Sequence, residues 1–190
     1  MSTEEVRIGD WMPTFTGRHF WVLDPRAEDV VIEDIAHQLA IINRYGGTSR
    51  VPVSVAQHSV LVSRLCEKLE PANRDSWLWG LLHDAGEAYL GIDVPRPVKR
   101  LFPEIDAAEK RILQVVVERF GLTWPAPEVV KIADEIALAT EARDFVSQRN
   151  DIRTWEIPQE PLPEVLRWTG WQWAESEFLT RFHRLSKDRQ

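Results

Sequence analysis

The chain has 190 residues, 44% of them hydrophobic and 28% charged, which is the composition of one globular domain rather than a disordered chain. Its formal net charge of −7, with no basic stripe, argues against nucleic acid as a partner. No apolar run approaches the roughly 18 residues that a membrane span needs, and the polar N-terminus has no signal-peptide core. We therefore expect a cytoplasmic protein with no membrane or nucleic-acid partner.

The apolar periodicity predicts an all-α fold whose helices are separated by glycine and proline. The expected segments, in chain order, are a loop or short hairpin over Trp11 to Arg26, and helices from Glu28 to the Gly46-Gly47 pair, from Ser54 to the residue before Pro71, from Asp75 to Tyr89, from Glu104 to Phe120, from Pro127 to Gln148 and from Trp171 to Leu185. Ser54 can cap its helix, and Gln57 three residues later completes a capping box. Pro95 and Pro97 exclude a regular helix in the loop that they interrupt.

One domain is expected to span residues 1–190, because no internal repeat or low-complexity tract divides the chain. Residues 1–27 form its aromatic-rich N-terminal part, 28–148 its helical core, and 151–190 a tryptophan-rich segment that packs on the core. Four tryptophans crowd this last part: Trp155, Trp168, Trp171 and Trp173. Aromatic side chains of this kind either attach a segment to the core or form a subunit interface, so a homo-oligomer, dimeric or larger, is expected.

Two histidines and two aspartates lie beside apolar helix faces: His58, His83, Asp84 and Asp134. A carboxylate in such a place is costly unless it is paired or bound to a metal. Taken singly, each residue has a plainer explanation, either a histidine bonded to a backbone carbonyl or an aspartate in a salt bridge. His83 and Asp84 also lie about 100° apart on a straight helix, although side chains of different length can still converge on one ion. Together, two imidazoles and two carboxylates suit a divalent transition metal.

The order of these residues resembles the HD-domain phosphohydrolase superfamily. The matching segments run from about Glu33 to Asp144 and are Ile42-Asn43-Arg44-Tyr45, Ala56-Gln57-His58-Ser59, His83-Asp84-Ala85-Gly86-Glu87 and Gly91 to Lys99. They are most similar to the nucleotide-acting branch, which contains bacterial 5′-deoxynucleotidases and phage HD-type dATP triphosphohydrolases. The nucleotidases usually have Arg-Trp in place of Arg44-Tyr45 and often Glu-His in place of Gln57-His58, differences that affect substrate choice and not the metal site.

The resemblance implies a helical HD-domain fold with one divalent ion (Mn, Co, Ni, Fe, Zn or Mg) held by His58, His83, Asp84 and Asp134. It also implies that Glu87 orients or deprotonates the attacking water, the alternative being an exposed glutamate at a helix end. Asp93 is a candidate to contact the sugar or to protonate the leaving oxygen. A turn-capping aspartate is the alternative there.

Three further residues are candidates for substrate binding. The resemblance assigns Arg44 to phosphate, for which a guanidinium fork is suited, and the alternative is a solvated arginine at a helix C-terminus. Tyr45 can stack on the sugar and base or limit their size. Lys99 can reach the outer phosphates of a triphosphate, unless it is a surface lysine.

The expected function is a metal-dependent phosphohydrolase that acts on small nucleotides. The first expectation is a 5′-nucleotidase that releases phosphate from (deoxy)nucleoside monophosphates. One alternative is a deoxynucleoside triphosphate triphosphohydrolase, of the dATP type, that releases intact triphosphate, for which Arg96, Lys99 and Arg100 are possible sources of positive charge. A second alternative is a non-catalytic HD module that binds a nucleotide.

Overall fold

Helices form most of the part of the chain that the computed structural model describes, residues 6–146, 155 and 157–187. The helices, in chain order, are η1 (Ala27–Asp29), α1 (Ile32–Ile41), η2 (Arg44–Gly47), α2 (Val55–Leu69), α3 (Arg74–Leu82), α4 (Ala85–Leu90), α5 (Arg96–Lys99), α6 (Pro103–Arg119), α7 (Glu128–Glu141), η3 (Ala142–Val146) and α8 (Trp171–Ser186). A two-stranded hairpin is the sole sheet within these ranges. The prediction of an all-α fold is confirmed. Among the described helices, none is long and apolar enough to cross a membrane.

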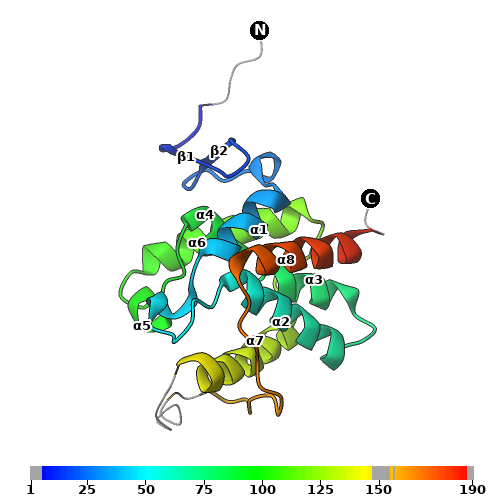
Figure 1. Ribbon diagram of the computed structural model, residues 1–190. Coiled ribbons are helices and arrows are strands. Elements are labelled where there is room, and N and C mark those ends of the chain that lie inside the picture. The colour runs from blue at the N-terminus through cyan, green and yellow to red at the C-terminus, as the bar shows by residue number, and fades with distance from the viewer. Residues whose placement is uncertain (1–5, 147–154, 156, 188–190) are drawn as a thin grey trace.

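Helix α2 is the central element, and it packs against α1, α3, α7 and α8 (Figure 1). As predicted, Ser54 caps it, and the Ser54 hydroxyl accepts a hydrogen bond from the Gln57 backbone N–H. The second half of the predicted capping box is wrong, because the Gln57 side chain bonds Arg167 and Thr169 of the C-terminal region instead. The start of α2 is therefore tied to a segment more than a hundred residues away.

The structure corrects four predicted helical segments. The helix expected from Glu28 to the Gly46-Gly47 pair is α-helical only from Ile32 to Ile41, because Ile42 is extended and Asn43 pairs with Ser54 in an antiparallel bridge, so Arg44 lies in η2 instead. The single helix expected from Asp75 to Tyr89 is two helices, because α3 ends at Leu82 and α4 begins at Ala85. The loop around Pro97 contains the short helix α5, where the proline lies in the first turn and its missing N–H is not needed. The helix expected to reach Gln148 is α-helical only as far as Glu141 and widens into the π-helix η3, and residues 147 and 148 lie outside the described residues.

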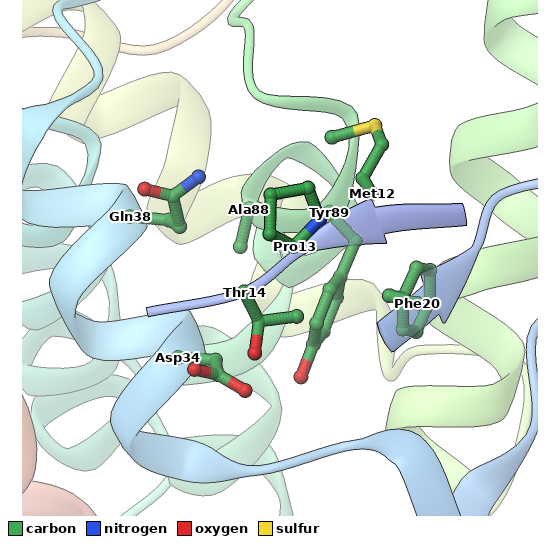
Figure 2. A pocket seen from close by; sticks show the side chains of 8 residues that line it. All are labelled: Met12, Pro13, Thr14, Phe20, Asp34, Gln38, Ala88 and Tyr89. Carbon is green, nitrogen blue, oxygen red and sulfur yellow. The ribbon is translucent and has the colours of Figure 1, made fainter. Parts of the chain in front are cut away.

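The N-terminal hairpin pairs β1 (Trp11–Pro13) with β2 (His19–Trp21) in antiparallel register, which confirms the predicted hairpin. Phe20 is buried and stacks on Tyr89 of α4 with 3.9 Å between ring centroids. Asp34 of α1 accepts a hydrogen bond of 2.7 Å from the Thr16 N–H. Figure 2 shows these side chains around a cavity of about 10 Å³, which has room for about one water molecule.

The connection from α7 to α8, of which residue 155 and residues 157–170 are described, runs back along the molecule from η3 to the start of α8 (Figure 1). Arg143 of η3 donates to the carbonyl oxygens of Leu162 and Glu164, and Asp144 accepts from the Leu166 N–H. Four residues form the apolar face of α8 in the core: Ala174, Phe178, Phe182 and Leu185. The tryptophans of this region are 42–47% exposed, so α8 contacts the core mainly through these four side chains.

Candidate metal centre

The two ring nitrogens of His58 face different carboxylates: Nδ1 faces Glu141, and Nε2 faces Asp134 and Asp84. The side chain is fully buried in the first turn of α2. Its Nδ1 lies 3.0 Å from Glu141 Oε1, and because a carboxylate only accepts, Nδ1 carries the hydrogen. Its Nε2 lies 3.1 Å from Asp134 Oδ1 and 3.7 Å from Asp84 Oδ2. Nε2 forms no hydrogen bond with the described residues.

His83 has the same arrangement at the end of α3. Its Nδ1 donates to the Gly80 carbonyl oxygen at 2.9 Å, which leaves Nε2 to face the centre. That Nε2 lies 3.2 Å from Asp84 Oδ2 and 4.0 Å from Asp134 Oδ1, again without a hydrogen bond to the described residues. The two imidazoles are 5.3 Å apart between centroids. When the rings are neutral, the lone pairs of both Nε2 atoms are thus directed into a space that carboxylates border.

Asp84 reaches this space because the helix breaks at that residue. With φ −101° and ψ 12°, Asp84 lies between α3 and α4 rather than inside a helix. Its Oδ2 is therefore near the Nε2 atoms of both histidines, although two adjacent residues of a straight helix would point about 100° apart. The break explains how neighbouring residues can face one site.

The four residues come from α2, the α3–α4 junction and α7, and they form what we call the metal centre: His58, His83, Asp84 and Asp134. Ligand atoms of His58, His83 and Asp134 all lie within 4.8 Å of one another, close enough to hold one ion. Asp84 Oδ2 lies beside two of these atoms, at the distances given above. The sequence prediction named these four residues as ligands, and three of them, His58, His83 and Asp134, form the group that could hold an ion.

Positive charge is favoured at this centre. Burial and Arg44 oppose the charged imidazolium of His58, yet Glu141 and Asp134 outweigh them and raise its pKa to about 9. Burial likewise opposes charge on His83, but the carboxylate of Asp84 raises its pKa. A divalent cation site is expected to have these two features: Nε2 atoms without a hydrogen-bond partner among the described residues, and nearby carboxylates that a positive charge would stabilise.

Arg44 and Tyr45 lie directly beside the metal centre. The Arg44 side chain is buried, so it is not the solvated arginine considered as an alternative. Its Nε donates to Glu141 Oε2 at 3.0 Å, and its Nη1 lies 3.4 Å from Asp84 Oδ2. Tyr45 has a left-handed backbone with φ 62°, and its hydroxyl donates to the same Glu141 oxygen at 2.7 Å.

Glu87 and Lys99 have surroundings that the sequence left open. Glu87 is only 4% exposed, so it is not a solvated glutamate at a helix end, and its Oε2 has no hydrogen-bond partner among the described residues. Burial, with Asp84 and Asp93 nearby, raises its pKa to about 10. Lys99 pairs with Glu109 of α6 at 2.5 Å and makes no direct contact with the metal centre.

A hollow of about 290 Å³ adjoins Asp93 and the residue before Arg44. Three isoleucines, Ile41, Ile42 and Ile92, supply its apolar wall, and Gln38, Asn43 and Asp93 supply polar groups. Burial and the nearby Asp84 raise the pKa of Asp93, although Arg44 opposes the shift. The hollow therefore combines apolar surface with hydrogen-bonding groups at one edge of the site.

Two proteins match most of the chain at high identity. The protein YfdR of Escherichia coli (strain K12) is 42% identical over 135 residues, which cover 71% of this chain and 72% of YfdR. The chain belongs to the YfdR family. An uncharacterized protein of Rhodobacter capsulatus is 40% identical over an alignment of 146 residues, with 71% of this chain and 72% of that protein covered. No family model matches the chain.

One residue of the site in this YfdR-family chain was missed by the sequence reasoning. Glu141 is 1% exposed and bonds His58, Arg44 and Tyr45 at once. A signal was present, because Glu141 follows Asp134 by seven residues, two turns along the same face of α7. Its partners, however, precede it by 83 to 97 residues, and no local pattern predicts such pairing.

Proposed function

We propose that this YfdR-family chain is a metal-dependent nucleotide phosphohydrolase of the HD-domain type. Within that class we propose a 5′-nucleotidase that releases phosphate from (deoxy)nucleoside monophosphates. The observation that carries the proposal is the buried imidazole of His58 together with the partly buried imidazole of His83, each with Nδ1 bonded to the protein and Nε2 facing Asp84 and Asp134 without a hydrogen-bond partner among the described residues. The resemblance of the sequence motifs to the HD-domain superfamily supplies the class of reaction.

The donor set fits a divalent metal with nitrogen and oxygen ligands. His58, His83, Asp84 and Asp134 would hold the ion. When bound, it supplies a Lewis acid for a phosphate oxygen, lowers the pKa of water and offsets the negative charge of the two aspartates. Without the ion, burial and the negative charge of the neighbouring aspartates keep Glu87 protonated. When a bound ion offsets that negative charge, Glu87 is ionised and can act as a base.

Hydrolysis of a monophosphate forms a bond between a water oxygen and phosphorus and breaks the bond between phosphorus and O5′. The water loses a proton and the nucleoside oxygen gains one. We assign the first proton to Glu87, whose buried Oε2 has no other partner among the described residues. Asp93 is the candidate donor to the leaving oxygen or partner for the sugar, because it borders the hollow and burial raises its pKa above that of a free aspartate.

The surroundings of the site favour a monophosphate over a triphosphate. Lys99, one of the three candidates for outer phosphates, is paired with Glu109 instead. Arg44 has its Nε and Nη1 directed to Glu141 and Asp84, which leaves Nη2 without a bond to the described residues and available to one phosphate. The hollow beside Asp93 is near the lower end of the usual range for small-molecule sites, about 300–1,000 Å³, which suits one nucleoside.

The test is hydrolysis of a panel of nucleoside mono-, di- and triphosphates with Mn²⁺, Co²⁺ or Mg²⁺, with identification of the phosphate species released. We expect inorganic phosphate from monophosphates. Asp84→Asn should lower turnover by more than about 100-fold, because loss of a ligand exceeds the 10–100-fold cost of losing an outer-shell partner. Asp106→Asn makes the same chemical change at an exposed aspartate of α6 and should leave turnover unchanged.

Two outcomes would contradict the proposal in different ways. Release of intact triphosphate, with no phosphate from monophosphates, would replace the nucleotidase by the triphosphohydrolase. Nucleotide binding without any hydrolysis would favour a non-catalytic nucleotide-binding module. Undiminished metal-dependent hydrolysis by Asp84→Asn would show that the metal centre is not the catalytic site.

A further inference from the structure

Glu141 connects the metal centre to the residues proposed to bind substrate, and its two oxygens have different partners. Oε1 accepts from His58 Nδ1 at 3.0 Å. Oε2 accepts from Arg44 Nε at 3.0 Å and from the Tyr45 hydroxyl at 2.7 Å. The carboxylate is buried, and although burial opposes its ionisation, His58 and Arg44 lower its pKa, so it is charged at neutral pH.

The bond to Oε1 decides which nitrogen of His58 is free to bind a metal. A carboxylate in this position requires the hydrogen on Nδ1, so the neutral ring has its lone pair on Nε2, the atom that faces Asp134 and Asp84. With the opposite tautomer, a hydrogen on Nε2 would point into the metal centre. Glu141 thus fixes His58 as a ligand without itself reaching the centre.

The bonds to Oε2 position the two neighbouring residues of η2. Tyr45 has φ 62°, a left-handed conformation that is strained for an L-residue. Its hydrogen bond to Glu141 helps to offset that strain and holds the ring in place. The bond to Arg44 Nε orients the guanidinium so that Nη1 points toward Asp84.

We propose that Glu141 is a positioning residue that serves both halves of the site at once, with one oxygen for the metal ligand His58 and the other for Arg44 and Tyr45. This inference rests on the proposed function for its substrate half. The metal half stands on its own, because it predicts metal affinity in the absence of any nucleotide. A carboxylate is required because it offers two acceptor oxygens, whereas an amide offers one.

The metal half is tested with Glu141→Gln, measured by calorimetric titration of the purified chain with Mn²⁺ and no nucleotide. The single amide oxygen is drawn to Arg44 and Tyr45, which leaves the NH₂ group against His58 Nδ1 and favours the wrong tautomer. We expect Mn²⁺ to bind about 10–100-fold more weakly. Thermal unfolding of the metal-free variant checks that it is folded.

The chain offers a control at a second, partly buried histidine–glutamate pair. Glu175 on α8 lies 3.3 Å from His37 Nδ1, outside the metal centre. Glu175→Gln makes the same change of acid to amide and should leave Mn²⁺ affinity unchanged. Equal affinities for Glu141→Gln and Glu175→Gln would overturn the metal half. Absence of Mn²⁺ binding by the unmodified chain would instead contradict the proposed function.

The substrate half is tested with Tyr45→Phe, which removes the hydroxyl but leaves the bond between Glu141 and His58. We expect KM for the hydrolysed nucleotide to rise about 10-fold, the loss of a charge-assisted hydrogen bond of about 1.4 kcal/mol, while Mn²⁺ affinity stays within about twofold of the unmodified chain. An unchanged KM would overturn the substrate half. A loss of Mn²⁺ affinity as large as that of Glu141→Gln would show that the two oxygens do not act separately.

Discussion

The imidazoles of the metal centre are held through the nitrogen that faces away from it. His58 Nδ1 is bonded to Glu141 and His83 Nδ1 to the Gly80 carbonyl oxygen. Because each of these partners can only accept, Nδ1 carries a hydrogen in both rings, and the neutral form of each ring has its lone pair on the Nε2 atom that faces the metal centre. The orientation of the two imidazoles therefore depends on residues outside the metal centre, and Gly80 is one of them.

Gly80 also lies at a close approach of α3 to α2. A Cβ atom at this position would be 2.8 Å from Cys66 Sγ and 3.0 Å from Ser63 Cα, contacts that force the helices apart. We expect Gly80→Ala to lower the free energy of unfolding by about 1–3 kcal/mol, the usual cost of overpacking a core. Urea unfolding followed by circular dichroism measures the change.

Gly170→Ala is the control for this substitution, because the new Cβ would have only the far end of Gln172 within 4 Å. Its stability should stay within about 0.5 kcal/mol of the unmodified chain. If Gly80→Ala were equally mild, the close approach of α3 to α2 would be wrong. The position of the Gly80 carbonyl oxygen, which accepts from His83 Nδ1, would then not depend on this close contact.

At the scale of elements, some features could be predicted because their causes are local. The start of α2 follows from the Ser54 cap and the apolar spacing after it. The break at Asp84 could not be predicted, because Leu78, Leu81, Leu82 and Ala85 continue the apolar pattern straight through it. The break becomes understandable only when the imidazoles and the arginine that face Asp84 are in view.

The connection that leads to α8 is held by η3. There Arg143 and Asp144 pair with each other and form hydrogen bonds to the backbone of this connection. Asp144 accepts from Arg143 and from the Leu166 N–H, and its side chain is nearly buried. Asp144→Asn removes the charge and weakens these bonds. We expect it to lower the free energy of unfolding at pH 7 by about 1–3 kcal/mol, measured by urea unfolding.

The same substitution predicts a dependence on pH. Burial opposes ionisation of Asp144, but Arg143 and the Leu166 N–H outweigh it and lower its pKa. Its stabilisation is therefore complete above the pKa of an unfolded aspartate, about 3.9, and disappears as pH falls through the lower folded value. The stability difference between Asp144→Asn and the unmodified chain should be constant from pH 7 to about 5 and shrink below about 4. A difference that grows toward acid pH would contradict this pairing.

For the molecule as a whole, the sequence predicted the helical class and placed together His58, His83 and Asp134, which could hold an ion. His58 and Asp134 lie on α2 and α7, whose apolar spacing is visible in the sequence, so their side chains could be assigned to inward faces. The burial of Glu87 and Arg44, the pairing of Lys99 with Glu109 and the position of Glu141 could not be predicted. Each of these depends on how helices distant in sequence pack together.

The metal centre joins α2, the α3–α4 junction and α7, so an ion bound there connects three parts of the fold (Figure 1). A ligand that binds only the folded chain stabilises it by about 2.7 kcal/mol at a concentration 100 times its Kd. For a domain of this size, that corresponds to a rise in Tm of about 5–10 °C. We expect Mn²⁺ to raise the Tm of the EDTA-treated chain by this amount, measured by differential scanning calorimetry.

Asp134→Asn tests whether that stabilisation arises at the metal centre. Removing the charge of Asp134 takes away the only ligand of the centre that α7 supplies, so the ion would no longer connect α7 to α2 and α3. The rise in Tm with Mn²⁺ should then fall to about a third or less, whereas Asp106→Asn should keep it in full, because Asp106 pairs with Lys110 at an exposed position. A full rise in Asp134→Asn would place the stabilising ion elsewhere on the acidic surface, and Asp134 would then be no more than a partner for His58.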